Sequence, residues 1–175
     1  MEPWQPQPNA KWDLVPSDDR AYEFTQQRQR MRLRHLERVQ RVCDLVRRHE
    51  YVVILGPAYS DKTLLMGDVN ALLATGDQFT PIFINLWRVR TDDEAAFFGS
   101  LAQTIVRSEA ISAGLADPSR LTERVCDAAS FRQFLDDLLQ QHDRHIVLLL
   151  DHLQSLPHDL THRLLQLLRG AYMDR

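Results

Sequence analysis

The stretch YVVILGPAYSDKTLLM, residues 51–66, decides the predicted fold. Its first part, Tyr51–Leu55, is a short apolar run rich in β-branched residues, which is typical of a buried strand. Glycine and proline follow at once, so we expect the strand to end in a turn. From Thr63 to Ala74 the pattern favours a helix, with Gly76 as its C-cap. The stretch therefore predicts a strand, a loop and a helix in direct succession.

The loop has the spacing of a phosphate-binding loop, which is glycine, four residues, then glycine, lysine and serine or threonine. Its eight places, and the residue that follows them, are Gly56, Pro57, Ala58, Tyr59, Ser60, Asp61, Lys62, Thr63 and Leu64. In such a loop, backbone N–H groups at the helix N-terminus face the phosphates. We expect Lys62 to reach the β- and γ-phosphates and Thr63 to bind Mg²⁺ through its hydroxyl.

Lysine is rare in this chain. Of its 21 Lys and Arg residues, only Lys11 and Lys62 are lysine. Arginine supplies the positive charge everywhere else, and its planar fork differs from the compact ammonium of lysine. This bias indicates that Lys62 occupies a place where arginine would not serve.

A second apolar run, HIVLLLD, spans His145–Asp151 and ends in a carboxylate. A buried strand that ends in aspartate is the usual second half of a phosphate and Mg²⁺ site. We expect Asp151 to hold Mg²⁺ opposite Thr63, largely through water. Each half alone is a common pattern, whereas the two together, in this order, predict a nucleotide site.

The remaining chain alternates helices with apolar strands. The expected elements are a helix within 17–50, strands at Tyr51–Leu55, Pro81–Trp87 and His145–Asp151, a helix starting at a capping box at Thr91, short helical pieces or a loop over 111–129, a helix from Ser130 to about Asp143, and a last helix after Pro157. This order predicts an α/β fold, a three-layer P-loop NTPase-like parallel sheet of three core strands with helices on both faces. Ligands of such sheets bind at the carboxyl ends of the strands.

Three regions are expected. Residues 1–16 form an extended or disordered arm, residues 17–50 an amphipathic Arg-rich helical segment, and residues 51–175 a P-loop NTPase-like domain truncated at its C-terminus. The helical segment carries one apolar stripe at helical spacing. Its members are Leu33, Leu36, Val39, Val42, Cys43 and Val46.

Composition excludes several classes of protein. A hydrophobic fraction of 44% and a formal net charge of -3 fit a globular protein without general affinity for nucleic acid or acidic membranes. Cys43 and Cys126, the only cysteines, make neither a disulfide framework nor a zinc site. The N-terminus lacks the pattern of a signal peptide, and the apolar runs are too short to span a bilayer. We expect a cytoplasmic protein.

These motifs resemble the AAA-like ATPase domains of bacterial multidomain proteins, related to the STAND class of signalling NTPases. In those domains GPxxSGKTxLL precedes xxINL, and LLLDExxxLP follows. This chain has GPAYSDKTLLM, IFINLW and LLLDHLQSLP, and the resemblance covers about Arg34 to Met173. It implies ATP and Mg²⁺ bound by Gly56–Thr63 and Asp151. It also implies a polar sensor at Asn85, for which a simple strand-end hydrogen-bonding role is an equal alternative.

Two residues depart from the family pattern. Asp61 replaces the last glycine of the loop and brings a negative charge beside the phosphates. At an effective dielectric of about 20, like charges about 4 Å apart repel by roughly 4 kcal/mol. His152 replaces the glutamate that activates water, and histidine, although able to act as a general base, supplies no carboxylate. We therefore expect ATP hydrolysis to be slow or absent.

A third departure concerns the sheet. The family places a further strand between the loop strand and the strand that ends in Asp151, and the sequence stops at Arg175 before it. Both flanking strands would then have an exposed edge, which self-association or a partner domain could cover.

Two other functions remain open. The chain could be a degenerate NTPase module that serves assembly or signalling without turnover. Less expected is nucleic-acid binding through the basic face of Gln26–Arg48, which has no interleaved aromatic residues for base stacking.

Overall fold

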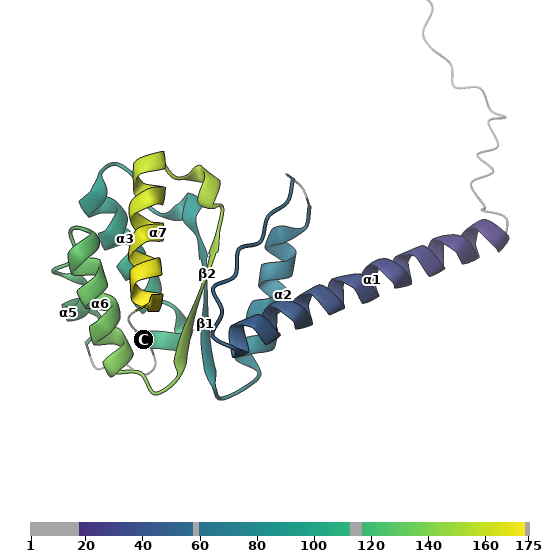
Figure 1. Ribbon diagram of the computed structural model, residues 1–175, viewed down its shortest axis with the longest axis horizontal. Helices are drawn as coiled ribbons and strands as arrows, with labels where there is room; N and C mark the ends of the chain where they lie inside the picture. Colours follow the sequence, from purple (N-terminus) through teal and green to yellow (C-terminus); the bar gives the residue numbers. More distant parts are fainter. Residues whose placement is uncertain (1–17, 58–59, 113–116, 174–175) are drawn as a thin grey trace, which may run out of the picture. The chain divides into compact units, whose positions relative to one another are not determined.

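The computed structural model describes residues 18–57, 60–112 and 117–173, and it is a mixed α/β structure with a small parallel sheet (Figure 1). Residues up to Glu37 and residues from Arg38 form separate compact units. The expected arm over residues 1–16 lies outside the described residues. The described elements, in order, are α1 (Asp18–Arg47), α2 (Lys62–Ala74), β1 (Phe79–Asn85), the 3₁₀ turn η1 (Leu86–Arg88), α3 (Glu94–Val106), α4 (Glu109–Ser112), α5 (Pro118–Thr122), α6 (Ala128–Gln140), β2 (His145–Asp151), the 3₁₀ turn η2 (Leu153–Ser155) and α7 (His158–Met173).

The sheet pairs β1 with β2 in parallel, from Phe79 opposite His145 to Asn85 opposite Asp151. The N–H of His145 donates to the carbonyl of Gln78 at 3.0 Å. Peptide groups alternate along a strand, so Pro81, three residues after Gln78, has its nitrogen on the outer edge of β1. Proline therefore removes no hydrogen bond from the pairing.

One face of the sheet supports the larger hydrophobic core. Its strand residues are Ile82 and Ile84 of β1, with Ile146, Leu148 and Leu150 of β2. They pack against α3, α6 and α7 around a set of aromatic side chains, each at most 2% exposed: Phe97, Phe98, Phe131 and Phe134. These helices lie together on one side of the sheet (Figure 1).

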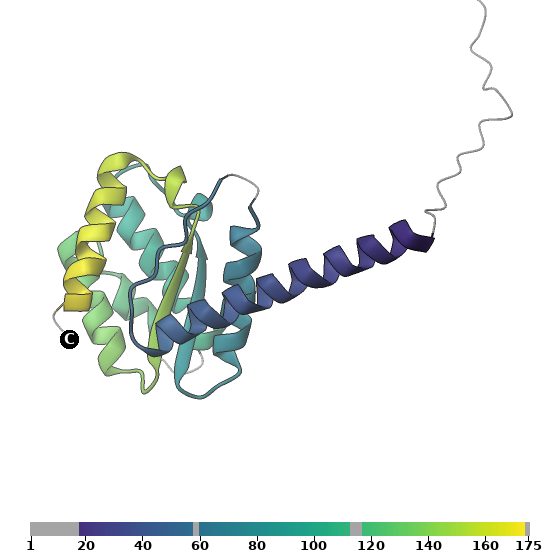
Figure 2. The ribbon, with the colours of Figure 1, turned by 45° about the vertical axis from the view of Figure 1, so that its right-hand side comes forward.

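The alternate strand residues point to the opposite face, where α2 and the last turns of α1 cover them (Figure 2). Phe79 and Leu149 contact a core that contains Met66, Val69 and Cys43. Burial raises the pKa of the Cys43 thiol, with Asp44 adding to the rise and Arg47 opposing it. A thiol kept protonated is a poor metal ligand.

The expected strand at Tyr51–Leu55 is wrong, because residues 51–57 form no strand and pair with neither β1 nor β2. The prediction of three core strands is corrected to two within the described chain. Exposure still alternates along the run: Tyr51, Val53 and Leu55 are 49%, 63% and 88% exposed, and Val52 and Ile54 are half-buried. Period-two burial is that of an extended chain, so the segment has the side-chain pattern of a strand without a hydrogen-bonded neighbour.

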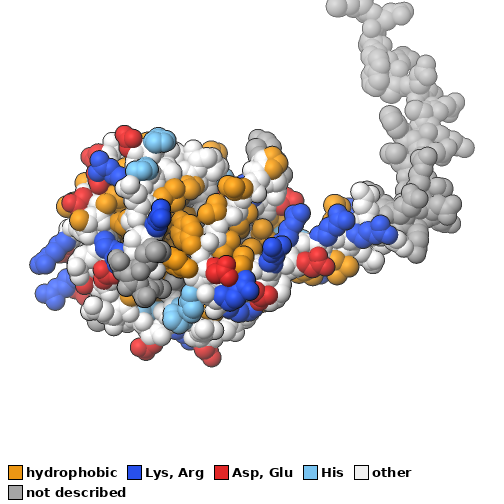
Figure 3. All heavy atoms as spheres, viewed as in Figure 1, with side chains coloured by type: hydrophobic (Ala, Val, Ile, Leu, Met, Phe, Trp, Pro, Cys, Tyr) orange, Lys and Arg blue, Asp and Glu red, His pale blue; other side chains and the backbone are white. Residues whose placement is uncertain are grey.

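A cavity of ≈ 1430 Å³ lies between this segment and β2; we call it the β2 groove. Both helix layers line it, with Met66 and Val69 on one side and Leu165 and Leu168 on the other. Hydrophobic side chains gather on this face, in the middle of the view in Figure 3. Since His145 directs its N–H toward β1, the peptide groups of Ile146, Leu148 and Leu150 face the groove. The groove thus runs along an edge of β2 that no other described strand pairs with, whereas the strand expected on its far side, Tyr51–Leu55, is not formed.

Several element boundaries also differ from expectation. α2 ends at Ala74 with Thr75, not Gly76, as its cap, and the expected strand through Trp87 ends at Asn85. The N-cap of α3 is Asp93 rather than Thr91, and that of α6 is Asp127 rather than Ser130. Aspartate at both positions accepts from the backbone of its own helix, which satisfies an N–H that the helix leaves free.

Only the last part of the expected α1 stripe is buried. Val39 and Cys43 are 5% and 0% exposed, whereas Leu33 and Leu36 are 60% and 53% exposed. Helical spacing correctly identified one face of the helix but not the length of the face that packs.

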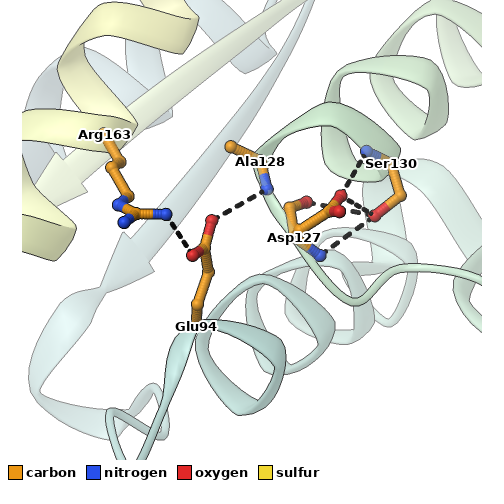
Figure 4. Close-up of polar contacts among 5 residues, drawn as sticks. All are labelled: Glu94, Asp127, Ala128, Ser130 and Arg163. Carbon is orange, nitrogen blue, oxygen red and sulfur yellow. Dashed lines mark hydrogen bonds and ion pairs between the residues drawn. The ribbon is translucent and has the colours of Figure 1, made fainter.

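Glu94, the first residue of α3, links three helices (Figure 4). Its Oε1 accepts a 3.3 Å hydrogen bond from the N–H of Ala128 at the start of α6, and its Oε2 pairs with Arg163 of α7. Next to it, Asp127 and Ser130 form a reciprocal capping box. Their hydrogen bonds hold the pKa of the Asp127 carboxyl below its usual range.

Candidate functional site

The predicted loop places Asp61 in a left-handed conformation, with φ 55° and ψ 22°, immediately before α2. This is the place of the pattern's last glycine, and a positive φ is the conformation in which glycine has no steric cost. Aspartate is one of the few other residues that visit this region. Asp61 therefore has a conformation that glycine would adopt at the same position without steric cost. Asp61 is exposed and makes no capping hydrogen bond with its side chain.

Lys62 begins α2 and folds back over the loop. Its Nζ donates to the carbonyl of Gly56 at 3.0 Å, to the Oγ of Ser60 at 3.1 Å and to the carbonyl of Pro57 at a shorter distance. The Oγ of Ser60 also donates to Pro57 at 2.8 Å. The ammonium thus lies among the loop's own oxygens, beside the helix N-terminus. Ala58 and Tyr59, also predicted to bind the phosphates, lie outside the described residues, and Leu64 is exposed in the first turn of α2.

Thr63 and Asp151, distant in the sequence, are in direct contact. The Oγ1 of Thr63 donates to the Oδ2 of Asp151 at 2.7 Å, across 88 positions of the chain. Asp151 is the last residue of β2 and is 7% exposed. Alternation along β2 places it on the same face as Val147 and Leu149, which is the face that α2 covers. The structure therefore brings together the two residues that the sequence predicts as Mg²⁺ ligands.

His152 follows Asp151 at the same end of the sheet. Its backbone is left-handed, with φ 60° and ψ 37°, and its N–H donates to the Oδ1 of Asp151 at 2.8 Å. The imidazole Nε2 lies 3.6 Å from the Oδ2 of Asp151. The three side chains of Thr63, Asp151 and His152 thus form one polar cluster, and Asp151 receives a bond on each carboxylate oxygen.

Asn85, the end of β1, lies in register with Asp151. Its Oδ1 accepts a hydrogen bond from the N–H of Trp87 at 3.0 Å and caps η1. The simple strand-end role foreseen for Asn85 is therefore present. The cap also presents Trp87, a residue that sequence reasoning placed inside a strand and gave no role.

The oxygen donors of this cluster fit Mg²⁺. That ion prefers oxygen ligands and is usually held by one or two protein groups together with phosphates and water. Thr63 supplies a hydroxyl and Asp151 a buried carboxylate. Among the described residues there is no group of three or more His, Cys, Asp or Glu side chains placed to hold a metal without phosphate.

Comparisons with protein-family models, with curated proteins and with solved structures return no match. In the part of the chain that the structure describes, no helix combines the length and the apolar character needed to cross a bilayer. The features of the structure that bear on function are the loop, the N-terminus of α2 and the end of β2.

Proposed function

We propose that Gly56–Leu64 and Asp151 bind ATP together with Mg²⁺, and that the chain is a P-loop ATPase domain of the AAA-like, STAND-related class. The observation that carries the proposal is the 2.7 Å hydrogen bond from Thr63 to Asp151. It joins the helix after a phosphate-loop pattern to the carboxyl end of a parallel strand, the edge where α/β sheets bind ligands. Helices on both faces of the sheet support the three-layer P-loop architecture.

The roles of the residues follow from their chemistry. The first N–H groups of α2 have no partner within the helix and attract phosphate. The Lys62 ammonium would exchange its loop oxygens for those of the β- and γ-phosphates. Mg²⁺, held by Thr63 and Asp151, would neutralise charge on the same phosphates.

We propose that the domain hydrolyses ATP slowly or not at all, and that it acts as a regulatory switch. Asp61 adds a negative charge at the loop, and no carboxylate follows Asp151 to accept a proton from water. A domain of this kind would respond to whether nucleotide is bound rather than to rapid hydrolysis.

The proposal is tested by titrating ATP–Mg²⁺ onto the intact chain and onto Lys62→Ala. Hydrogen bonds to charged groups contribute about 1.5–3 kcal/mol, so we expect saturable binding that weakens at least about tenfold in the variant. Lys11→Ala, which removes the only other lysine, is the matched control and should bind like the wild type. Equal binding by Lys62→Ala and the wild type would contradict the proposal.

A second candidate function is a degenerate module that serves assembly. The observation in its favour is the β2 groove, where an apolar cavity meets an unpaired sheet edge. The same titration separates the two functions, because a degenerate module would bind no ATP at millimolar concentration.

A further inference from the structure

His152 and Trp87 form a stacked pair beside the polar cluster. β1 and β2 end opposite each other at Asn85 and Asp151, and each is followed by a 3₁₀ turn. Trp87 projects from η1, and its ring lies over the imidazole of His152, with centroids 4.8 Å apart and planes inclined by 5°. Trp87 is nevertheless 73% exposed. A large apolar ring that is mostly exposed thus stacks on an imidazole next to a polar site.

Two contacts orient the imidazole of His152. The amide nitrogen of Gln154 is 3.4 Å from the Nδ1 of His152. This contact leaves the other ring nitrogen, Nε2, on the side of Asp151. Nε2 is 3.6 Å from the Oδ2 of Asp151, longer than a normal hydrogen bond.

The backbone of His152 is held in an uncommon conformation. A left-handed φ of 60° is sterically costly for a residue with a side chain. Its carbonyl accepts from the N–H of Ser155 at 2.9 Å and from the hydroxyl of Ser155 at 2.7 Å. Together with the bond from its own N–H to Asp151, these contacts fix the residue at both peptide groups. Strain maintained in this way is found mainly at functional sites.

We infer that His152 is a hydrogen-bond donor to the terminal phosphate of a nucleoside triphosphate, and that Trp87 is the positioning residue that holds its ring. The inference rests on the proposed function and deepens it. The Nε2 of His152 lies 3.6 Å from the Oδ2 of Asp151, the atom that also accepts from Thr63, where the outermost phosphate and its Mg²⁺ would be. A donor at this place would contact the outermost phosphate alone, so His152 distinguishes triphosphate from diphosphate.

The test measures the affinity of the intact chain for ATP–Mg²⁺ and for ADP–Mg²⁺ separately. We expect His152→Ala to weaken ATP binding about tenfold, as loss of one hydrogen bond to a charged group implies, with less than about a twofold change for ADP. Trp87→Ala should weaken ATP binding in the same selective way. Trp87→Phe keeps an aromatic face for stacking and should restore most of the affinity.

The outcomes separate this inference from the proposed function. Equal losses for ATP and ADP in His152→Ala would overturn the phosphate-donor role while leaving the nucleotide site intact. Wild-type affinity in Trp87→Ala would overturn the positioning role alone. Binding of neither nucleotide by the wild type would overturn the proposed function, and the inference with it.

Discussion

Asp61 adopts a left-handed backbone, with φ 55°, at the position where the phosphate-loop pattern has glycine. It keeps a conformation that glycine adopts freely but adds a negative charge. Its side chain is exposed, so water screens its charge, and the repulsion of a phosphate about 4 Å away lies near 1 kcal/mol rather than the 4 kcal/mol of a less hydrated pair. The charge of Asp61 would therefore weaken phosphate binding without preventing it.

Replacing Asp61 separates its charge from its shape. Asp61→Gly and Asp61→Asn both keep a residue that tolerates a positive φ, and both remove the charge. We expect each variant to bind ATP–Mg²⁺ about fivefold more tightly in a calorimetric titration, the effect of about 1 kcal/mol. A gain in the glycine variant alone would assign the obstacle to the bulk of the side chain, and no gain in either would show that Asp61 does not oppose the nucleotide.

At the scale of the element, helix starts depend on which residue among several candidates is placed to cap. The sequence favours Ser130 as the start of α6, because serine followed by glutamine at the third position fits a capping box. In the structure Asp127 is the N-cap, and Ser130 is its partner inside the helix. Both are good capping residues. The N–H of Ala128 also donates to Glu94, a contact from another helix that local sequence does not contain.

The Asp127 cap predicts a pH dependence. Hydrogen bonds from the Ser130 hydroxyl and N–H lower the pKa of the Asp127 carboxyl in the folded state. A carboxyl whose folded pKa is lowered stabilises the fold above its unfolded pKa of about 3.9, and this contribution is lost as the pH falls through the folded value. We expect the Tm of Asp127→Asn to be below that of the wild type at neutral pH, with the difference disappearing in acid.

Melting curves between pH 7 and pH 3 test this expectation. Ser130→Ala removes the hydroxyl donor but leaves the carboxylate, so it should show a smaller pH dependence than the wild type. A Tm difference between Asp127→Asn and the wild type that stays constant over this range would contradict the linkage.

At the scale of the whole molecule, strand β2, helix α2 and the meeting of Thr63 with Asp151 were all predictable. The strand and the helix follow from local sequence patterns. The meeting of Thr63 with Asp151 follows from the rule that parallel strands carry ligand-binding residues at their carboxyl ends. The segment Tyr51–Leu55 was not, because a strand needs a hydrogen-bonded neighbour and its own residues cannot supply one. The apolar composition predicted a buried strand, but it could not specify a pairing partner, and the structure has no strand at these residues.

The same distinction explains Trp87. The apolar run Pro81–Trp87 gives no sign that the strand ends at Asn85. The end of the strand depends on the side-chain amide of Asn85, whose oxygen accepts from the N–H of Trp87 once the chain has turned. The stacking of Trp87 on His152 joins residues from two different turns and has no local pattern. The β2 groove, by contrast, was foreseeable as an unpaired edge, although its volume and its lining from both helix layers required the structure.

The most direct test of the central claim is a residue-resolved titration of the ¹⁵N-labelled chain with ATP–Mg²⁺ by NMR. We predict saturable shifts of the amides of Gly56, Ser60, Lys62 and Thr63, accompanied by those of Asp151 and His152, with α5 and α6 unaffected. Shifts confined to the arginines of α1, or no shifts at millimolar ATP, would contradict a nucleotide site formed by the loop and the end of β2.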